Sequence, residues 1–222
     1  MREREEKARH TKRPPRGRAP KPPTPGPRDE DQYNFTDPDS RIMKNSTDAG
    51  FDQHYNAQVA VDQASLFIVA ATVSNHPNDQ HEVEPTVDAL SPRLGQPDAA
   101  ALDTGYWSPA NVQVLATRGI EPYIATGREP HHPSWQSWFA PQPGPPSLDA
   151  SAKEQMAYKL QTELGKAIYA LRKETVEPVI GILKEVLGFR QFSLRGLVSV
   201  TGEWCLVCLA FKLKRWHTLR AG

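Results

Sequence analysis

The sequence of 222 residues lacks long apolar runs, has only two cysteines and carries almost no net charge. A membrane-spanning helix needs a run of about 18 apolar residues, and the chain has none. The first residues are charged where a secretory signal would be apolar, so we expect a cytoplasmic protein with no membrane partner. Cys205 and Cys208 cannot form a disulfide framework, which agrees with a reducing compartment.

The net charge of +1 hides an uneven distribution. Residues 1–28 hold 10 basic and 3 acidic side chains, and residues 184–222 hold 7 and 2. Residues 29–150 hold 5 basic and 17 acidic side chains, and residues 151–183 hold 5 and 4. Basic ends around an acidic centre suit a polyanion at the ends and a cation in the middle. On charge alone, an ordinary solvated surface is the simpler interpretation.

The N-terminal region is rich in proline and basic residues. Seven prolines lie between Pro14 and Pro27, where they disfavour helix and sheet alike. Residues 1–32 are therefore predicted to be a disordered basic arm or linker, which could follow DNA phosphates or act as a tether. The ordered domain is predicted to cover residues 33–216, with a short tail at 217–222.

Residues 55–125 predict an α/β arrangement. Tyr55–Val61 alternates apolar and polar residues, whereas Leu66–Val73 is continuously apolar, which is typical of a central strand covered on both faces. A turn at Asp62 would join the two as a hairpin. The further expected elements are a helix at 78–90, a strand at 99–102, a helix at 108–119 with Ser108 as its N-cap, and a strand at 122–125.

The C-terminal region is predicted to be helical from Ala150 onward. We expect Thr175 to cap a second helix, with Pro178 in its first turn and Gly188 at its end. A last helix is predicted at 196–214, with an apolar face that includes Trp204 and Cys208.

Two carboxylates are the main candidates for chemistry. Asp103 follows a buried strand, where α/β sheets place ligands, although it could equally cap the turn before Gly105. Glu177 is expected at the start of a helix, with Gly181 and Lys184 on the same face. Gly181 would allow close approach of a backbone or substrate. A first-turn glutamate that favours the helix dipole is the common structural alternative for Glu177.

Other residue groups carry weaker signals. The Cys205–Cys208 pair lacks two further zinc ligands, which favours core packing. Asp62 and Asp79 suit turn and helix-start roles. The loop at 127–149 contains possible ligands and base-stacking groups that could equally anchor the loop: His131, His132, Trp135 and Trp138.

Several segments occur in an order that resembles one family. They are residues 33–43, 55–62, Asn78-Asp79, 102–106, 119–125, 169–184, 188–192 and 203–208. Together they resemble the C-terminal part of DDE transposases of bacterial insertion sequences, over about residues 33–216.

This resemblance implies a ribonuclease-H-like fold that cuts and joins DNA with Mg²⁺ or Mn²⁺. Asp103 matches the second acidic residue of the family and Glu177 the third, and both would bind metal. Tyr169, Arg172, Glu177 and Lys184 match the family's tyrosine-arginine-glutamate-lysine signature, with one extra residue between arginine and glutamate. Tyr169, Arg172 and Lys184 would contact DNA, on which the family implies a homo-oligomer in the bacterial nucleoid.

The sequence departs from the family at its front. The first aspartate, in an Asp-Gly-Thr-like motif on the first strand, is absent, and Asp37, Asp39 and Asp62 are poor substitutes. The missing strand would lie centrally in the sheet. We therefore expect a C-terminal fragment that lacks strand-transfer activity. The alternatives are an inactive DNA-binding remnant that interferes with full-length transposase, and a generic α/β domain without a nucleic-acid function.

Overall fold

The computed structural model describes residues 26, 32–44, 50–127, 144–147 and 149–221. Two units divide the chain, Met1–Tyr33 and Asn34–Gly222, and the second unit holds every described helix and strand. The predicted basic arm lies outside the described residues, apart from residues 26 and 32. The predicted ligands His131 and His132 and the tryptophans Trp135 and Trp138 also lie outside them.

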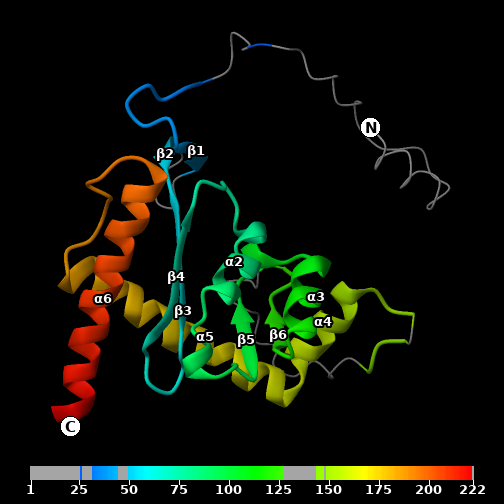
Figure 1. Ribbon diagram of the computed structural model, residues 1–222. Coiled ribbons are helices and arrows are strands. Elements are labelled where there is room, and N and C mark those ends of the chain that lie inside the picture. Colours follow the sequence, from blue (N-terminus) through cyan, green and yellow to red (C-terminus); the bar gives the residue numbers. More distant parts are fainter. Residues whose placement is uncertain (1–25, 27–31, 45–49, 128–143, 148, 222) are drawn as a thin grey trace. The chain divides into compact units, whose positions relative to one another are not determined.

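The described strands form three separate two-stranded sheets (Figure 1). Two sheets are antiparallel pairs and the third is parallel. In chain order the pairs are β1 Arg41–Lys44 with β2 Phe51–His54, β3 Asn56–Val61 with β4 Ile68–Ser74, and β5 Ala99–Leu102 with β6 Glu121–Ile124.

The predicted hairpin of two apolar strands is confirmed as β3 and β4. Asp62 caps its turn, because its carboxylate accepts hydrogen bonds from the Ser65 N–H at 2.8 Å and the Ser65 hydroxyl. The prediction that the second strand is central is wrong for the described residues, since β4 pairs only with β3. Its apolar run is explained by contact with two helices, α2 and α6.

The β1–β2 hairpin was not predicted. Four described strands, not two, therefore precede the first helix. Its strands are short and mostly exposed, so they lack the apolar alternation from which strands are predicted. A turn at Asp37–Ser40 precedes this hairpin, in which the Ser40 N–H donates to the Asp37 carbonyl at 3.2 Å.

Short helices connect the strands. The helix predicted at 78–90 is shorter than expected: a 3₁₀ turn, η1 Asp79–His81, precedes α2 Val83–Asp88. Two further 3₁₀ turns, η2 Pro92–Leu94 and η3 Thr104–Tyr106, flank β5. The helix α3 Pro109–Thr117 confirms its prediction, because the Ser108 hydroxyl accepts from the Asn111 N–H and Gly119 adopts a φ of 67° after the helix.

The C-terminal helices differ from their prediction at one place. α4 Ala152–Gln161 ends at Thr162, which caps α5 Glu163–Gly181. A π-helical turn, η5 Ile182–Val186, extends α5, and Gly188 follows it with a φ of 70°. Thr175 and Pro178 therefore lie inside α5, so the predicted helix start at Thr175 is wrong.

Packing explains why α5 continues through a proline. A proline in a helix interior costs about 3 kcal/mol. Buried Val179 and Leu183, beyond Pro178, keep the helix in the core. The Thr175 hydroxyl donates to the Leu171 carbonyl at 2.7 Å, as interior threonines do, instead of capping a new helix.

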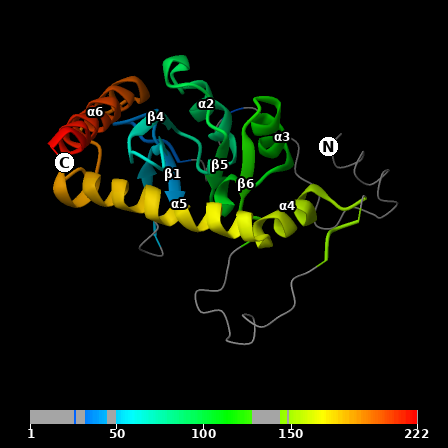
Figure 2. The same cartoon turned by 90° about the horizontal axis from the view of Figure 1, so that it is seen from below.

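Two apolar cores hold the unit together. In the first core, Ile68 of β4 and Val179 of α5 pack with Trp204, Cys208 and Phe211 of α6 Leu197–Ala221. In the second, Leu115 of α3 packs with three buried residues, which are Val83, Ile120 and Ile124. α5 contacts β3, β5 and β6 and runs along one side of the sheets (Figure 2). The predicted α/β class is thus confirmed, with its strands split into small sheets.

Candidate functional site

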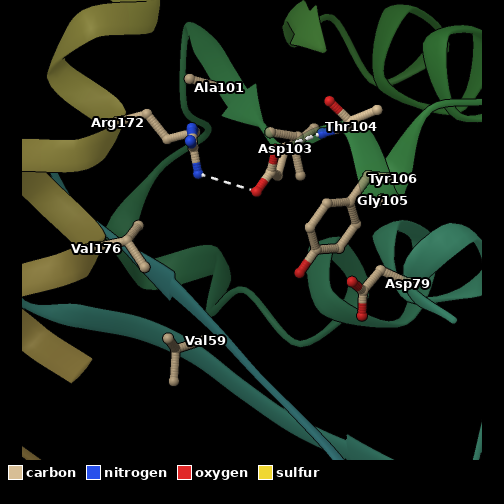
Figure 3. A pocket seen from close by; sticks show the side chains of 10 residues that line it. Val59, Asp79, Ala101, Asp103, Thr104, Gly105, Tyr106, Arg172 and Val176 are labelled. Carbon is tan, nitrogen blue, oxygen red and sulfur yellow. Dashed lines mark hydrogen bonds and ion pairs between the residues drawn. The ribbon is translucent and has the colours of Figure 1, made fainter. Parts of the chain in front are cut away.

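A cavity of about 420 Å³ lies between the β3–β4 and β5–β6 sheets (Figure 3). Val59 of β3 lines it on one side and Ala101 and Leu102 of β5 on another, while Arg172 and Val176 line it from α5. We call the space bounded by these five residues the β3–β5 slot. Asp79, Asp103 and Tyr106 also line the cavity and supply further polar groups.

Asp103 lies directly after β5, as predicted. One carboxylate oxygen accepts from the Thr104 N–H at 2.7 Å, so Asp103 caps η3. The other oxygen lies 3.5 Å from Nη1 of Arg172. The capping role of Asp103 is therefore confirmed, and the residue also lines the cavity, whereas its role in chemistry stays a prediction.

Arg172 extends from α5 toward Asp103 (Figure 3). Its guanidinium lies 5.3 Å from the centre of the Tyr169 ring, a cation–π distance. The Nε–H of Arg172 is buried and finds no hydrogen-bond acceptor among the described residues. An unsatisfied buried donor of this kind costs about 1–3 kcal/mol. The Nε–H of Arg172 is thus a buried donor that could bond to a ligand in the site.

A polar network lines the cavity beside Asp103. One oxygen of the Asp79 carboxylate accepts from Nδ2 of Asn56 and from Nε2 of Gln58, each at 2.9 Å. The Tyr106 hydroxyl donates to Oε1 of Gln58, which links the end of β5 to β3. Gly105 lies so near that a Cβ there would come 2.9 Å from the other Asp79 oxygen. The network fixes Asp79 at the same cavity as Asp103.

Sequence reasoning missed the place of Asp79 in this site. We predicted that Asp79 only begins a helix, and it does begin η1. Its carboxylate instead bonds to side chains of β3, which is a contact between distant segments that periodicity does not reveal. Asn56 and Gln58 are two residues apart and therefore lie on the same face of the strand. This pair of polar side chains was the signal in the sequence for a polar partner such as Asp79.

Titration of Tyr106 should make the fold less stable at alkaline pH. Burial, followed by the charges of Asp79, Glu82 and Asp103, raises the pKa of its hydroxyl above the ordinary value. The neutral hydroxyl therefore stabilises the fold fully below the unfolded-state pKa of about 10, and this stabilisation is lost as the pH rises toward the folded pKa. We expect the unfolding free energy to fall above about pH 10, by at most about 1.4 kcal/mol per pH unit for this group.

In the variant Tyr106→Phe, the unfolding free energy should fall less steeply with pH above about pH 10. Denaturant unfolding across this pH range measures the slope. Part of the slope should remain, because the pKa of Tyr55 is raised in the same direction by burial and by its hydrogen bond to Asp37. Equal slopes in wild type and Tyr106→Phe would contradict the prediction.

Glu177 is not brought to this cavity. It lies in the interior of α5, not at a helix start, and its side chain is exposed. Val176, its neighbour, lines the slot instead. Outside its chain neighbours and its own helix backbone, no described atom lies within 4 Å of a Cβ placed at Gly181, so no other described segment approaches it, and the approach of a substrate there stays a prediction. Asp103 and Arg172 therefore form an ion pair at the cavity, whereas Glu177 does not line it.

Lys184 lines a second cavity, of about 930 Å³. Arg190 and Arg195 also line it, together with aromatic side chains that include Phe192 and Trp204. Arg190 is exposed and pairs with Glu185 at 2.5 Å. Lys184 and Arg172 therefore line different cavities of the same unit.

The residues at the first cavity do not fit a complete metal site. Among the described residues, no group of three or more histidine, cysteine, aspartate or glutamate side chains could hold a metal ion. The outer oxygen of Asp103 faces the Arg172 guanidinium, and one oxygen of Asp79 is taken by two amides. Two-metal phosphodiester chemistry relies on carboxylates that converge on the ions. Here Asp103 lines the cavity and Glu177 is not among its lining residues.

Only one of the two cysteines packs in the core. Cys208 is 1% exposed in the first core, and Cys205 is exposed on the same helix. Burial raises the pKa of the Cys208 thiol to about 12, which keeps it protonated and poorly suited to metal binding. The prediction of core packing is confirmed for Cys208 and is wrong for Cys205, which is exposed.

A family model matches part of the chain. Searches of curated proteins and of solved structures found no significant similarity. In the described part of the chain, no helix is long and apolar enough to span a membrane. Residues 147–217, which include α4, α5 and most of α6, match the family model described as the transposase DDE domain. The match agrees with the resemblance predicted from the sequence, and this part of the chain is similar to a transposase DDE domain.

Proposed function

We propose that this chain is the C-terminal part of a transposase catalytic domain of ribonuclease-H-like fold, which binds the DNA of an insertion sequence. One observation carries the proposal. Asp103, at the end of β5, faces Arg172 of α5, which belongs to the segment that matches the transposase DDE domain. A carboxylate at a strand end beside a cation is an arrangement suited to a phosphodiester and its metal ions.

Complete transposases of this kind use divalent metal ions, Mg²⁺ or Mn²⁺, to activate a nucleophile and stabilise a leaving oxygen. In this chain Arg172 and Lys184 would bind DNA phosphates, with Tyr169 orienting the Arg172 guanidinium. Asp103 and Glu177 are our proposed catalytic carboxylates. We propose that they do not cleave DNA by themselves, because the described donors do not converge and the sheet is split beside Asp103.

Metal-dependent nicking tests this proposal directly. Purified chain is incubated with supercoiled DNA and Mg²⁺ or Mn²⁺, with Glu177→Gln as the matched variant. We expect both proteins to leave the DNA intact. Nicking that Glu177→Gln abolishes would contradict the proposed incompleteness, because it would require a full set of carboxylates within this chain.

DNA binding should survive without cleavage. We expect duplex binding, measured by fluorescence anisotropy, to weaken steeply as salt rises, because phosphate contacts release counterions. Lys184→Ala should weaken binding severalfold and lower the salt slope by about 1. Lys153→Ala, an exposed lysine of α4, is the control and should change neither quantity. Binding that does not depend on salt concentration would contradict the proposed role of Lys184. Equal effects of Lys184→Ala and Lys153→Ala would also contradict it.

A second candidate function is interference with an intact transposase. The basic residues of 1–28 and 184–222 favour it, since they would let an inactive chain occupy DNA ends. Such a chain would join a homo-oligomer on DNA without contributing a working site. Loss of strand transfer when this chain is titrated into an active transposase from the same element would support this role.

A further inference from the structure

Two exposed histidines lie on either side of the first 3₁₀ turn. His76 precedes η1 and His81 is its last residue. Their ring centres are 5.6 Å apart, with an angle of 63° between the ring planes. The two side chains therefore meet across a short loop that contains Asp79.

A buried carboxylate holds the ring of His76. Glu82 is 1% exposed, and its Oε1 accepts from the Ser74 hydroxyl at 2.8 Å and lies 2.7 Å from Nδ1 of His76. A buried carboxylate needs such donors, so the proton of the neutral imidazole belongs on Nδ1. Its Nε2 then carries a lone pair, which is the group through which an imidazole binds a metal ion. Carboxylates in this position are typical second partners of metal-binding histidines.

The free ring nitrogens have the spacing that a shared metal ion requires. Among the described residues, nothing hydrogen-bonds to Nε2 of His76 or to the ring nitrogens of His81. A metal–nitrogen bond of about 2.0–2.1 Å places an ion about 3.2 Å from the centre of an imidazole ring, so two rings that share a tetrahedral ion have centres about 5–6 Å apart. An edge contact between two aromatic rings has a similar spacing and is the structural alternative.

We propose that His76 and His81 together bind one first-row transition metal ion of the Zn²⁺ or Ni²⁺ type. The described part of the chain offers no third histidine, cysteine or carboxylate for this ion, so water would fill its remaining positions. Imidazole nitrogens suit Zn²⁺ and Ni²⁺, whereas Mg²⁺ and Mn²⁺ favour carboxylate and water oxygens. The ion is therefore different from the one in the proposed function, and the inference goes beyond that function.

A metal ion at this site would fix the loop that carries Asp79. Nδ2 of Asn56 in β3 donates to the His76 carbonyl at 3.3 Å and to the Asp79 carboxylate at 2.9 Å, so the loop is already attached to β3. The ion would add a connection between the two ends of the loop. We expect it to slow amide hydrogen exchange in residues 76–82.

Zinc titration of the purified full chain tests the proposal. By isothermal titration calorimetry, we expect a saturable site for one Zn²⁺ with a Kd below about 100 μM, which Mg²⁺ does not compete for. His76→Ala and His81→Ala should each weaken this site at least tenfold. His217→Ala, at an exposed histidine of α6, is the matched control and should leave it unchanged. Absence of a saturable site, or equal affinity of wild type and His81→Ala, would overturn the proposal.

The sequence contains another pair of neighbouring histidines, His131 and His132, which the calorimetry must distinguish. The double variant His131→Ala/His132→Ala should keep the site. If this double variant lost Zn²⁺ binding while His76→Ala and His81→Ala kept it, the metal would belong to the other pair and the proposal would be wrong.

Nuclear magnetic resonance gives a readout that mere ring contact would not produce. In long-range ¹H–¹⁵N spectra, Zn²⁺ should shift Nε2 of His76 and one ring nitrogen of His81, and it should leave His217 unshifted. Glu82→Gln should weaken Zn²⁺ binding at least tenfold, because the amide orients the ring less firmly than the carboxylate. Unshifted His76 and His81 nitrogens at saturating Zn²⁺ would overturn the proposal. These measurements involve no DNA, so they stand or fall separately from the proposed function.

Discussion

Replacing Trp204 by alanine is expected to lower the unfolding free energy by about 3–5 kcal/mol. The side chain is 5% exposed and lies at the centre of the first core. Its ring centre lies 5.7 Å from that of Phe189 and 6.3 Å from that of Phe192. Its indole N–H donates to the Gln58 carbonyl at 3.0 Å. The substitution therefore leaves a cavity and also removes a hydrogen bond to β3.

The effect should reach the candidate site. Gln58 is the residue of β3 whose side chain bonds to both Asp79 and Tyr106, so Trp204 supports that strand from the opposite side. Urea unfolding gives the free energy, and hydrogen exchange at Asn56–Val61 reports on the strand. Leu206→Ala, on the same helix but 68% exposed, is the control and should change stability by less than about 0.5 kcal/mol.

Trp204→Phe separates the two contributions, because phenylalanine keeps most of the ring contacts and lacks the N–H. We expect it to cost about 1–3 kcal/mol, from the smaller ring and the Gln58 carbonyl left without this donor. If Trp204→Ala were no more destabilising than Leu206→Ala, the packing between α6 and β3 described above would be wrong.

The sequence predicted elements well where local pattern and burial agree. The alternation of 55–61 predicted β3, and the short apolar run before Asp103 predicted β5. Ser108 and Gly119 correctly mark the ends of α3. In each case the signal lies in neighbouring residues, so no tertiary information is needed.

Tertiary contacts account for the main errors. Thr175 and Pro178 resemble a helix start, yet burial on both sides of them holds α5 as one helix. This change moves Glu177 from a helix N-terminus to an exposed position in a helix interior. Asp79 was assigned only a local role because its partners in β3 lie more than 20 residues away.

The separation of the described strands into small sheets can be compared with the fold that the resemblance implies. The resemblance implies a strand in the centre of the sheet, and the described residues contain no such strand. In the described residues β3 and β5 each have one partner, and the slot between them is lined by residues of both. The proposed lack of cleavage follows from this feature, because the slot opens beside Asp103.

Replacing Gly165 by alanine is expected to destabilise the chain by about 3 kcal/mol, at the upper end of overpacking costs. Gly165 is buried just after the corner between α4 and α5, where Thr162 caps α5 by accepting its N–H at 3.0 Å. A Cβ at this position would overlap the Lys159 carbonyl oxygen and come 3.0 Å from the Leu160 Cα. These are backbone atoms, which cannot move aside without opening the corner.

Gly181→Ala is the matched control within the same helix. Outside its chain neighbours and its own helix backbone, no described atom lies within 4 Å of a Cβ there. Because alanine also favours helix over glycine, we expect stabilisation by about 0.5–1 kcal/mol. Urea unfolding of the two variants should therefore give changes of opposite sign. An opened corner should also shift the start of α5 and so weaken the pairing of Arg172 with Asp103. A Gly165→Ala protein as stable as Gly181→Ala would show that the close α4–α5 corner is not part of the native fold.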